Sequence, residues 1–392
     1  MSWFIPYNQL DTEQLSFLQN VNNNQDANYW LKGYAGSGKS VLLIHCLLKE
    51  KERRPNSNVI IVLYTHALID MIKTGIPAEY RNTQVVTYHQ FRRMNGNWDL
   101  ILVDEVQDLP EYVVRDVRSK GTRVIVAGDV NQSIYEDVCA IDAIQNILTS
   151  QSFALGIIHR ISRRIRQVAQ FFCADRNGFN ASSIGGMVER IPTLVKAVDN
   201  SEEIKWLITS SKEYAISGYA PAILIPKHEV IFQFLQKVLA QEGKPLMPQS
   251  YAAKGRDNYD SINDHLRTNG TRFQYLGNGA GSYDQASTDN LVTVMTYHSA
   301  KGLDFKAVFV PFLTPGLEIW RDNEERAKTL FFVAITRSRE QLFLSYHGNV
   351  KHRYLSLIPQ ADFHPLNAAD EINRMGNPLG ITPGDDEPLV VF

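Results

Sequence analysis

Short apolar runs alternate with amphipathic stretches along most of the chain. The runs are rich in Val, Ile and Leu and indicate buried strands, while the stretches between them carry apolar residues at helical spacing. This alternation is typical of α/β folds in which helices cover a mainly parallel sheet. The expected strands are residues 29–34, 59–64, 84–87, 100–104 and 123–127 in the first part of the chain, and 188–195, 222–225, 291–296, 307–310 and 341–345 in the second.

The apolar alternation stops between residues 149 and 153, and a new helical pattern begins at Arg160. We therefore expect one domain over residues 1–150 and a second over residues 151–364. Pro, Gly and Asp recur after His364, so residues 365–392 are expected to form an extended C-terminal tail. Residues 245–260 and 277–290 are expected to be long loops.

Composition and charge exclude several classes of protein. Among 392 residues, 40 Lys+Arg against 42 Asp+Glu give a net charge of -2, so any nucleic-acid contact must come from a local groove. Cys46, Cys139 and Cys173 lie far apart, which argues against a disulfide framework and a zinc site. No apolar run approaches the roughly 20 residues that span a bilayer, and no secretory signal is evident. These features predict a cytoplasmic protein with no membrane partner.

Residues 33–40, GYAGSGKS, match the phosphate-loop pattern GxxxxGK[ST]. The segment follows a predicted strand and opens a predicted helix, so backbone N–H groups and the helix N-terminus can surround a phosphate. A glycine-rich turn without a ligand is disfavoured, because both the motif and its context are present. The predicted ATP contacts in this loop are Gly33, Ala35, Gly36, Ser37, Gly38, Lys39 and Ser40, with Lys39 on the β/γ-phosphates and Ser40 on Mg²⁺.

A second chemical signal is the apolar run that ends in Asp104 and Glu105. Such a strand delivers two carboxylates to the edge of the sheet where ligands of open α/β folds bind. We expect Asp104 to hold Mg²⁺ through water and Glu105 to polarise the attacking water. A solvated strand end is the alternative, and the phosphate loop upstream disfavours it.

Four further segments stand in a characteristic order: DEVQD at 104–108, GDVNQSIY at 128–135, TYHSAKGLDF at 296–305 and LFFVAITRSR at 330–339. In this order they resemble the DExxD, GDxxQSIY, TxHxxKGLEF and YVAxTRA motifs of the UvrD/Rep-like branch of superfamily 1 helicases. The resemblance extends from Gln14 to about Tyr346. It implies two tandem RecA-like domains, ATP and Mg²⁺ in the cleft between them, and single-stranded DNA across both.

The resemblance also implies roles for individual residues. Gln14 is similar to the glutamine that reads adenine, although a helix cap formed with Asp11 is an alternative. Gln132 is similar to the γ-phosphate sensor, and Arg160 and Arg337 to the two arginines that contact the γ-phosphate. The catalytic set implied is Lys39, Asp104, Glu105, Gln132, Arg160 and Arg337.

Three positions depart from the family pattern. His159 stands where a tyrosine stacks on adenine, and a plain surface arginine therefore remains an alternative for its neighbour Arg160. Asp304, which with Gly302 is expected at the ATP site, replaces a glutamate and has a shorter reach toward the ribose. Asp137 stands where a tryptophan often stacks on a DNA base, which weakens or relocates the grip on the strand.

Polar and aromatic groups at strand ends are the expected nucleic-acid contacts, although each also has a structural explanation. They are Tyr64, Thr65, His89, Tyr135, Thr296 and His298. Inserted accessory subdomains are not expected. Residues 92–98 alone separate Phe91 from Asp99, and residues 245–290 fall short of a domain of at least ~50 residues. The chain is predicted to be a bare two-domain motor.

The leading hypothesis is an ATP-dependent single-stranded DNA translocase or helicase, with 3′-to-5′ polarity implied by the resemblance and weak processivity. One alternative is a nucleotide-gated, DNA-sensing ATPase subunit that regulates a partner such as a nuclease in repair or phage defence. Another is an RNA-directed motor. The intact catalytic set disfavours an inactive binding module, and the missing subdomains disfavour a processive stand-alone helicase.

Overall fold

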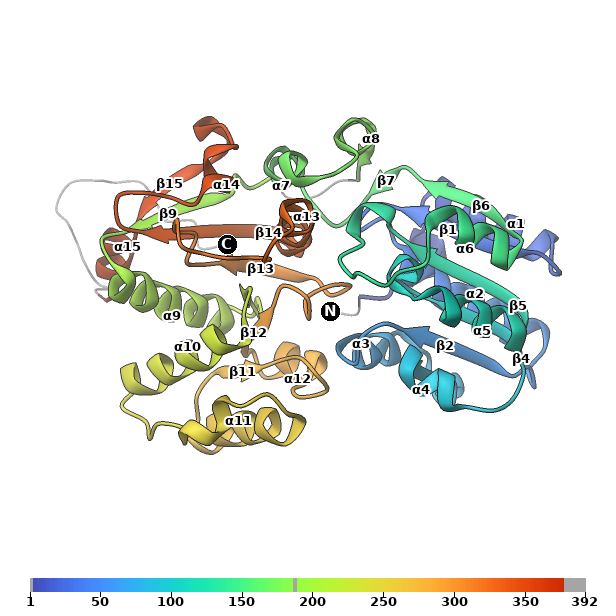
Figure 1. The fold of residues 1–392 in the computed structure, drawn as a ribbon, viewed down its shortest axis with the longest axis horizontal. Helices are drawn as coiled ribbons and strands as arrows, with labels where there is room; N and C mark the ends of the chain where they lie inside the picture. The colour runs from blue at the N-terminus through green and yellow to red at the C-terminus, as the bar shows by residue number, and fades with distance from the viewer. Residues whose placement is uncertain (1–2, 186–188, 377–392) are drawn as a thin grey trace.

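The computed structural model describes residues 3–185 and 189–376, which form two α/β domains side by side (Figure 1). The first domain contains a six-stranded, all-parallel sheet with strand order β3-β2-β4-β5-β1-β6. Its strands are β1 Asn28–Gly33, β2 Val59–Leu63, β3 Gln84–Thr87, β4 Trp98–Val103, β5 Gly121–Gly128 and β6 Ser150–Leu155.

Helices cover both faces of this first sheet. Alternate side chains of each strand point to opposite faces, so Leu31 and Ile61 pack with the side of α1, α2 and α3, while Trp30 and Ile60 pack with the side of α4, α5 and α6. Burial on both faces explains why the strands are continuous apolar runs. The helices are α1 Thr12–Asn23, α2 Lys39–Arg53, α3 Ala67–Gly75, α4 Tyr88–Arg93, α5 Glu111–Lys120 and α6 Ile141–Leu148.

The second domain contains a seven-stranded parallel sheet with strand order β11-β12-β10-β13-β14-β9-β15. Its strands are β9 Thr193–Ala197, β10 Ala222–Ile225, β11 Phe273–Tyr275, β12 Val292–Thr296, β13 Phe305–Val310, β14 Ser338–His347 and β15 His364–Asn367. Its helices are α9 Asn200–Ile216, α10 His228–Gln241, α11 Arg256–Thr268, α12 Tyr283–Thr288, α13 Glu324–Ile335, α14 Arg353–Ser356 and α15 Ala368–Gly376. The expected α/β class with two mainly parallel sheets is confirmed.

A small connecting unit joins the domains at the top of Figure 1. It consists of β7 Ile157–Ile158, α7 Arg163–Ala169, α8 Arg176–Ala181 and β8 Ser183–Ile184. Phe179 lies 5.4 Å from Tyr34 of the first domain and 5.3 Å from Phe332 of the second, measured between ring centroids. One hydrophobic cluster therefore runs through both domains, and it holds the facing edges of the two sheets close together.

The structure corrects several boundaries. Strand β6 pairs with β1, so the first sheet continues to Leu155 and the boundary expected after residue 150 is wrong. The tail expected from residue 365 is also wrong for its first part: β15 pairs with β9, and Leu366, Ile372 and Met375 pack on the core of the second domain. Residues 377–392 of that expected tail lie outside the described residues. The loop expected over residues 245–260 contains the first turn of α11, and the loop expected over residues 277–290 contains all of α12.

Only residues 94–97 connect α4 to β4, and α11 packs on edge strand β11. Tyr259, Ile262 and Leu266 of α11 are buried in the core of the second domain. The segment over residues 245–290 therefore extends the second sheet and does not form a separate subdomain. Within residues 3–185 and 189–376, no helix is long and apolar enough to cross a membrane.

Candidate nucleotide site and nucleic-acid groove

The phosphate loop connects β1 to α2, and two of its glycines have left-handed backbone conformations. Gly36 has φ +79° and Gly38 has φ +89°. A Cβ on Gly36 would lie 2.1 Å from the Cβ of Arg160, and a Cβ on Gly38 would lie 2.4 Å from Nε2 of Gln14. Glycine is thus required both by the turn and by the close approach of two other predicted site residues.

Lys39 and Ser40 begin α2, and the free backbone N–H groups of this helix N-terminus face the edge of the sheet where a phosphate can bind. Lys39 folds back over the loop, and its Nζ donates to the carbonyls of Gly33 at 2.9 Å and Tyr34 at 3.0 Å. Ser40 Oγ donates to Oδ2 of Asp104 at 2.5 Å. A hydroxyl and a carboxylate are the oxygen ligands that Mg²⁺ prefers, so Ser40 and Asp104 fit this ion. Burial, and then the charge of Glu105, raise the pKa of Asp104 to about 6.

Glu105 follows β4 with φ 56° and ψ 43°, a left-handed conformation that is costly for a residue with a side chain. Its Oε2 accepts a hydrogen bond from Nε2 of Gln107 at 2.5 Å, and Gln107 in turn accepts one from the backbone N–H of Asp129 at 3.1 Å. Burial favours the neutral acid, but the cations of Lys301 and Lys39 outweigh it and hold the pKa of Glu105 below its ordinary value. Glu105 is therefore a positioned, ionised carboxylate.

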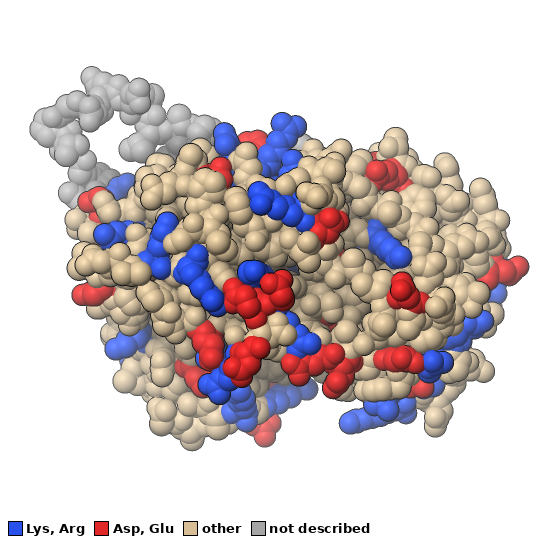
Figure 2. Space-filling view, turned by 45° about the horizontal axis from the view of Figure 1, so that its top comes forward, with Lys and Arg blue, Asp and Glu red and all other residues tan. Residues whose placement is uncertain are grey.

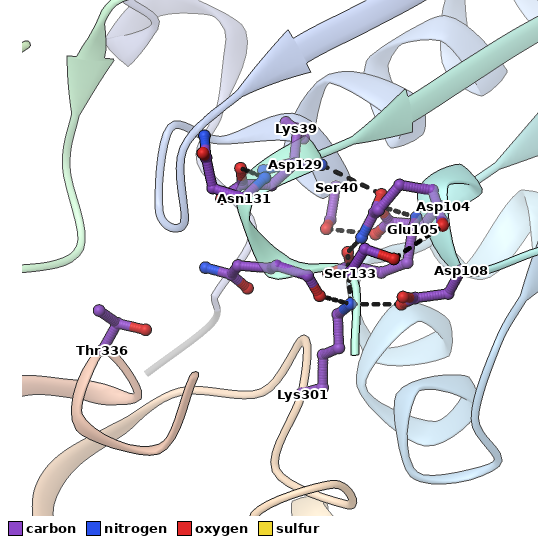
Figure 3. A network of polar contacts seen from close by, with 12 residues as sticks. Lys39, Ser40, Asp104, Glu105, Asp108, Asp129, Asn131, Ser133, Lys301 and Thr336 are labelled. Atoms are coloured by element: carbon purple, nitrogen blue, oxygen red, sulfur yellow. Dashed lines mark hydrogen bonds and ion pairs between the residues drawn. The ribbon is translucent and has the colours of Figure 1, made fainter. Parts of the chain in front are cut away.

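Lys301 extends from the second domain into the carboxylates of the first (Figure 3). It is 2% exposed, forms an ion pair with the buried Asp108, and donates to the backbone carbonyl of Gln132. Its Nζ lies 3.9 Å from Oε2 of Glu105. The sequence analysis assigned no role to Lys301 or Asp108. Both are charged residues inside the motif segments, and that position was the signal that could have identified them.

Arg337 reaches the same place from the end of α13. Its Nη2 donates to Oε1 of Gln132 at 3.2 Å, while its Nε donates to the carbonyl of Val333 at 2.8 Å. Nε2 of Gln132 is buried and has no hydrogen-bond partner among the described residues. Burial, and then the charge of Arg160, lower the pKa of Arg337 to about 9. The guanidinium is therefore held beside the amide of Gln132, whose Nε2 has no partner among the described residues.

Arg160 lies beside the phosphate loop and pairs with Asp304 of the second domain, with Nε 3.0 Å from Oδ2. Arg339 also approaches Asp304, at 3.6 Å. Gly302 has φ +83°, and a Cβ there would lie 2.5 Å from Leu68 of α3, so this glycine permits close packing between the domains. The structure thus brings Arg160, Gly302 and Asp304 to the cleft and places Asp304 between two arginines.

Gln14 and His159 lie beside the phosphate loop. Gln14 forms a capping box with Asp11, and its Nε2 also donates to the carbonyl of Ser37 at 3.1 Å, so the helix cap and the position at the site coexist. His159 hydrogen-bonds Asp11 through Nε2 at 2.6 Å, and its backbone N–H donates to Gly36 at 2.8 Å. Both predicted adenine-side residues are therefore held by one aspartate.

Most of these groups line one cleft of about 970 Å³, counting its open mouth. Three predicted site residues, Gly33, Ser37 and Asp104, are not among its lining residues and instead hydrogen-bond Lys39, Gln14 and Ser40, which are. Both domains line it, because Lys39, Glu105 and Gln132 come from the first and Asp304 and Arg337 from the second. Four apolar lining residues, Trp3, Ile5, Val41 and Met71, were not predicted, since isolated apolar residues carry no signal for a ligand.

A second groove, of about 650 Å³, crosses the same domain interface. The predicted nucleic-acid residues Tyr64, Thr65, His89, Tyr135 and His298 all line it. The rings of Tyr64 and Tyr135 are stacked, with centroids 4.2 Å apart and planes 26° apart. Burial, and then the charge of Lys301, lower the pKa of His298 to about 4, so this ring is neutral near pH 7.

Thr296 does not line the groove. Its Oγ1 donates to Oγ of Ser299 at 2.9 Å and accepts from the backbone N–H of Ser299 at 3.1 Å, which shapes the turn that leads to His298. His66, Thr87, Gly277, Asn278 and Ser299 also line the groove. Ser299 lies inside the segment 296–305, whereas His66, Gly277 and Asn278 stand in no motif. Lys and Arg are interspersed with Asp and Glu over the face shown in Figure 2.

Comparisons with known proteins agree with this arrangement. The family described as "UvrD-like helicase C-terminal domain" matches residues 250–349, and the family described as "AAA domain" matches residues 9–188. The second match contains the phosphate loop and the carboxylates, and the first contains Lys301 and Arg337.

Individual relatives match over shorter segments. The ATP-dependent DNA helicase Rep of Buchnera aphidicola subsp. Schizaphis graminum is 40% identical over 88 residues, which cover 19% of this chain and 13% of the relative. A probable DNA helicase II homolog of Mycoplasma capricolum is 34% identical over 97 residues, 23% of this chain and 13% of the relative. The ATP-dependent DNA helicase PcrA of Staphylococcus aureus is 32% identical over 96 residues, which cover 20% of this chain and 13% of the relative.

Among solved structures, one described as the structural basis for DNA unwinding at forked dsDNA by two coordinating Pif1 helicases has a TM-score of 0.46 and 14% identity. The match covers 95% of this chain and 98% of that one. The segments matched in the curated relatives span 13% of each relative's length. The ordered motifs and the two family matches, one in each domain, make the chain similar to the UvrD/Rep-like superfamily 1 helicases.

Proposed function

We propose that this chain is an ATP-dependent translocase and helicase on single-stranded DNA. The observation that carries the proposal is the hydrogen bond from Arg337 of the second domain to Gln132 of the first, inside the cleft that also contains the phosphate loop. A hydrolysis site completed from two domains makes turnover depend on how those domains are arranged.

Each group in the cleft has a chemical task in ATP hydrolysis. The phosphate loop and Lys39 bind the β/γ-phosphates, and the ionised Glu105 orients the attacking water. Ser40 and Asp104 would hold Mg²⁺, which supplies positive charge beside the phosphates when bound. Arg337 and Arg160 neutralise the charge that develops on the transferred phosphoryl group, a task for which a fixed guanidinium is suited.

The groove and the cleft are connected through two short segments. Gln132 lies at the cleft, and Tyr135, three residues later, lies in the groove. Lys301 contacts the carboxylates, and His298, three residues earlier, lies in the groove. A change in domain arrangement during hydrolysis therefore moves the groove residues of both domains relative to each other, which is the requirement for movement along a strand.

Polarity, processivity and the preference for DNA each have a separate line of support. The 3′-to-5′ direction is supported by the resemblance to the UvrD/Rep-like motifs. Weak processivity is supported by the short connection at residues 94–97 and by α11, which packs against the second sheet. Residues 3–185 and 189–376 therefore contain no separate subdomain that could hold a duplex junction. DNA in preference to RNA is supported by the names of the matched relatives, Rep and PcrA, which are DNA helicases.

Two measurements test this proposal. ATP hydrolysis should be low alone and rise strongly with single-stranded DNA, more than with duplex DNA or single-stranded RNA. Single-turnover unwinding should favour 3′-tailed over 5′-tailed duplexes and should fall steeply with duplex length. Stimulation by DNA without unwinding of any tailed duplex would favour a DNA-sensing ATPase, and greater stimulation by RNA would contradict the assigned substrate.

A further inference from the structure

Four aromatic rings form a row that crosses the domain interface at the groove. Tyr64 and Tyr135 of the first domain are stacked, Tyr135 lies 6.2 Å from His298 of the second domain, and His298 lies 5.2 Å from Trp320, between centroids. Tyr64, Tyr135 and His298 line the groove, whereas Trp320 extends the row beyond its lining. Each domain thus contributes one pair of neighbouring rings.

Trp320 is partly exposed, and a cation in its own domain holds it. The guanidinium carbon of Arg326 lies 5.7 Å from the indole centroid, a cation–π contact. Arg326 also forms an ion pair with Glu136 of the first domain, the residue that follows Tyr135. The segment that carries Tyr135 therefore also restrains the cation that holds Trp320.

We propose that Trp320 is a base-stacking residue that extends the single-strand groove past His298 and takes an unpaired nucleobase. The proposal rests on the single-stranded DNA binding argued above. Proteins that bind single strands hold successive bases on aromatic side chains, and stacking is insensitive to sequence because every base has a π-face. Two rings on each domain give each domain its own grip on the strand.

The charges around the four rings favour stacking on a base over attraction of a phosphate. His298, with its pKa lowered to about 4, is neutral near pH 7 and adds no positive charge beside the indole. Arg326 is already paired with Glu136, so its charge is balanced locally. The ligand recognised here is therefore the base and not the phosphate, and removal of the base should remove the contribution of Trp320.

The experiment compares Trp320→Leu with Trp320→Phe, since leucine keeps apolar packing but has no ring. The dissociation constant is measured by fluorescence anisotropy with labelled oligodeoxyadenosine and with an abasic oligomer of equal length. Loss of one stack of ~1–3 kcal/mol corresponds to about 5- to 150-fold weaker binding. We expect that loss for Trp320→Leu on oligodeoxyadenosine, a small loss for Trp320→Phe, and no change on the abasic oligomer.

Tyr112→Leu is the matched control, because Tyr112 is a 48% exposed ring with the guanidinium of Arg92 4.4 Å from its centroid, and it does not line the groove. It should bind both oligomers as the unmodified protein does. Trp320 does not line the nucleotide cleft, so the affinity for ATP should be unchanged in every variant. An unchanged affinity also shows that the fold is intact.

Two results would overturn the proposal: unchanged binding of oligodeoxyadenosine by Trp320→Leu, or an equal loss on the abasic oligomer. Should Trp320→Leu fail to fold, the ratio of affinities for the two oligomers in Trp320→Phe and the unmodified protein decides, because a smaller aromatic surface must lower that ratio. Failure of the unmodified protein to bind any single strand would instead contradict the proposed function itself.

Discussion

Arg337 and Gln132 are 205 positions apart in the sequence, and the hydrogen bond between Nη2 and Oε1, 3.2 Å long, joins the two domains at the nucleotide cleft. The bond is buried, since Arg337 is 1% exposed and Gln132 is also buried. The contact forms only when the two domains lie close enough to bury it, so it couples the cleft to their relative arrangement.

Replacement of Arg337 by alanine should lower the maximal rate of ATP hydrolysis by about 10³–10⁵-fold, because an arginine that meets developing charge acts mainly in the transition state. The dissociation constant for ATP should change by less than about tenfold. Steady-state kinetics and nucleotide titration separate the two effects. Arg321→Ala, at a 77% exposed surface arginine, is the control. Weaker ATP binding with an unchanged maximal rate would mark Arg337 as a ground-state contact.

Lys39 and Glu105 should fail in different ways. Lys39→Ala removes the cation that neutralises the phosphates and should reduce both ATP binding and turnover. Glu105→Gln keeps the shape and the position of the side chain but removes its ability to polarise water, so turnover should be abolished while ATP binding persists. Wild-type hydrolysis by Glu105→Gln would refute the assignment of the general base.

Gly36→Ala should disrupt the site through Arg160. The new Cβ would lie 2.1 Å from the Cβ of Arg160 and would force Arg160 or the loop to move, which should weaken ATP binding and lower turnover. Gly348→Ala is a close control, since Gly348 has φ +78° against +79° for Gly36 but has no atom within 4 Å of the added Cβ. Equal activity losses in the two variants would show that backbone strain, and not the contact with Arg160, limits position 36.

The buried pair of Lys301 and Asp108 should show strong coupling. Lys301→Met leaves a buried carboxylate without its cation and should lower the free energy of unfolding by about 3–5 kcal/mol in a urea titration. The double variant Lys301→Met with Asp108→Leu should recover most of that loss, because a packed apolar pair replaces the ion pair. Additive losses in the double variant would show that the two residues stabilise the protein independently.

Binding to single-stranded DNA should depend weakly on salt. Each phosphate neutralised on a single strand contributes about −0.7 to the slope of log affinity against log salt concentration. The net charge is -2 and the groove is lined by aromatic and polar side chains, so few phosphates should be neutralised. Affinity measured across a salt series gives the slope directly, and a value that implies about eight or more ion contacts would contradict an aromatic grip.

Local sequence determined the strands and the phosphate loop. Val59–Leu63 is buried along its whole length, and a continuous apolar run predicts such a strand from its neighbours alone. Gly36 and Gly38 are required by a turn whose geometry depends on a few adjacent residues. Because the carboxyl ends of parallel strands meet at one edge of the sheet, the sequence alone predicts that Lys39, Ser40 and Asp104 lie together there.

The edge strands β6 and β15 escaped prediction because they lack that signal, whereas the edge strand β3 was predicted over its full length. Strand β6, with sequence SQSFAL, is exposed along much of its length, so its residues need not be apolar. Strand β15 itself contains Pro365 and Asn367, and it and helix α15 are held by pairing with β9 and packing on α9. Their order comes from surfaces supplied by other parts of the chain.

Contacts between the domains were decided by tertiary structure alone. Asp108 and Lys301 lie 193 positions apart, and no local pattern relates them. Trp320 stands in a segment without a motif and joins the aromatic row only because β12, α13 and the first domain meet there. Sequence motifs identify which residues carry chemistry, whereas the packing of two sheets against each other determines which of those residues touch, because the free energy of burial acts on surfaces brought together from the whole chain.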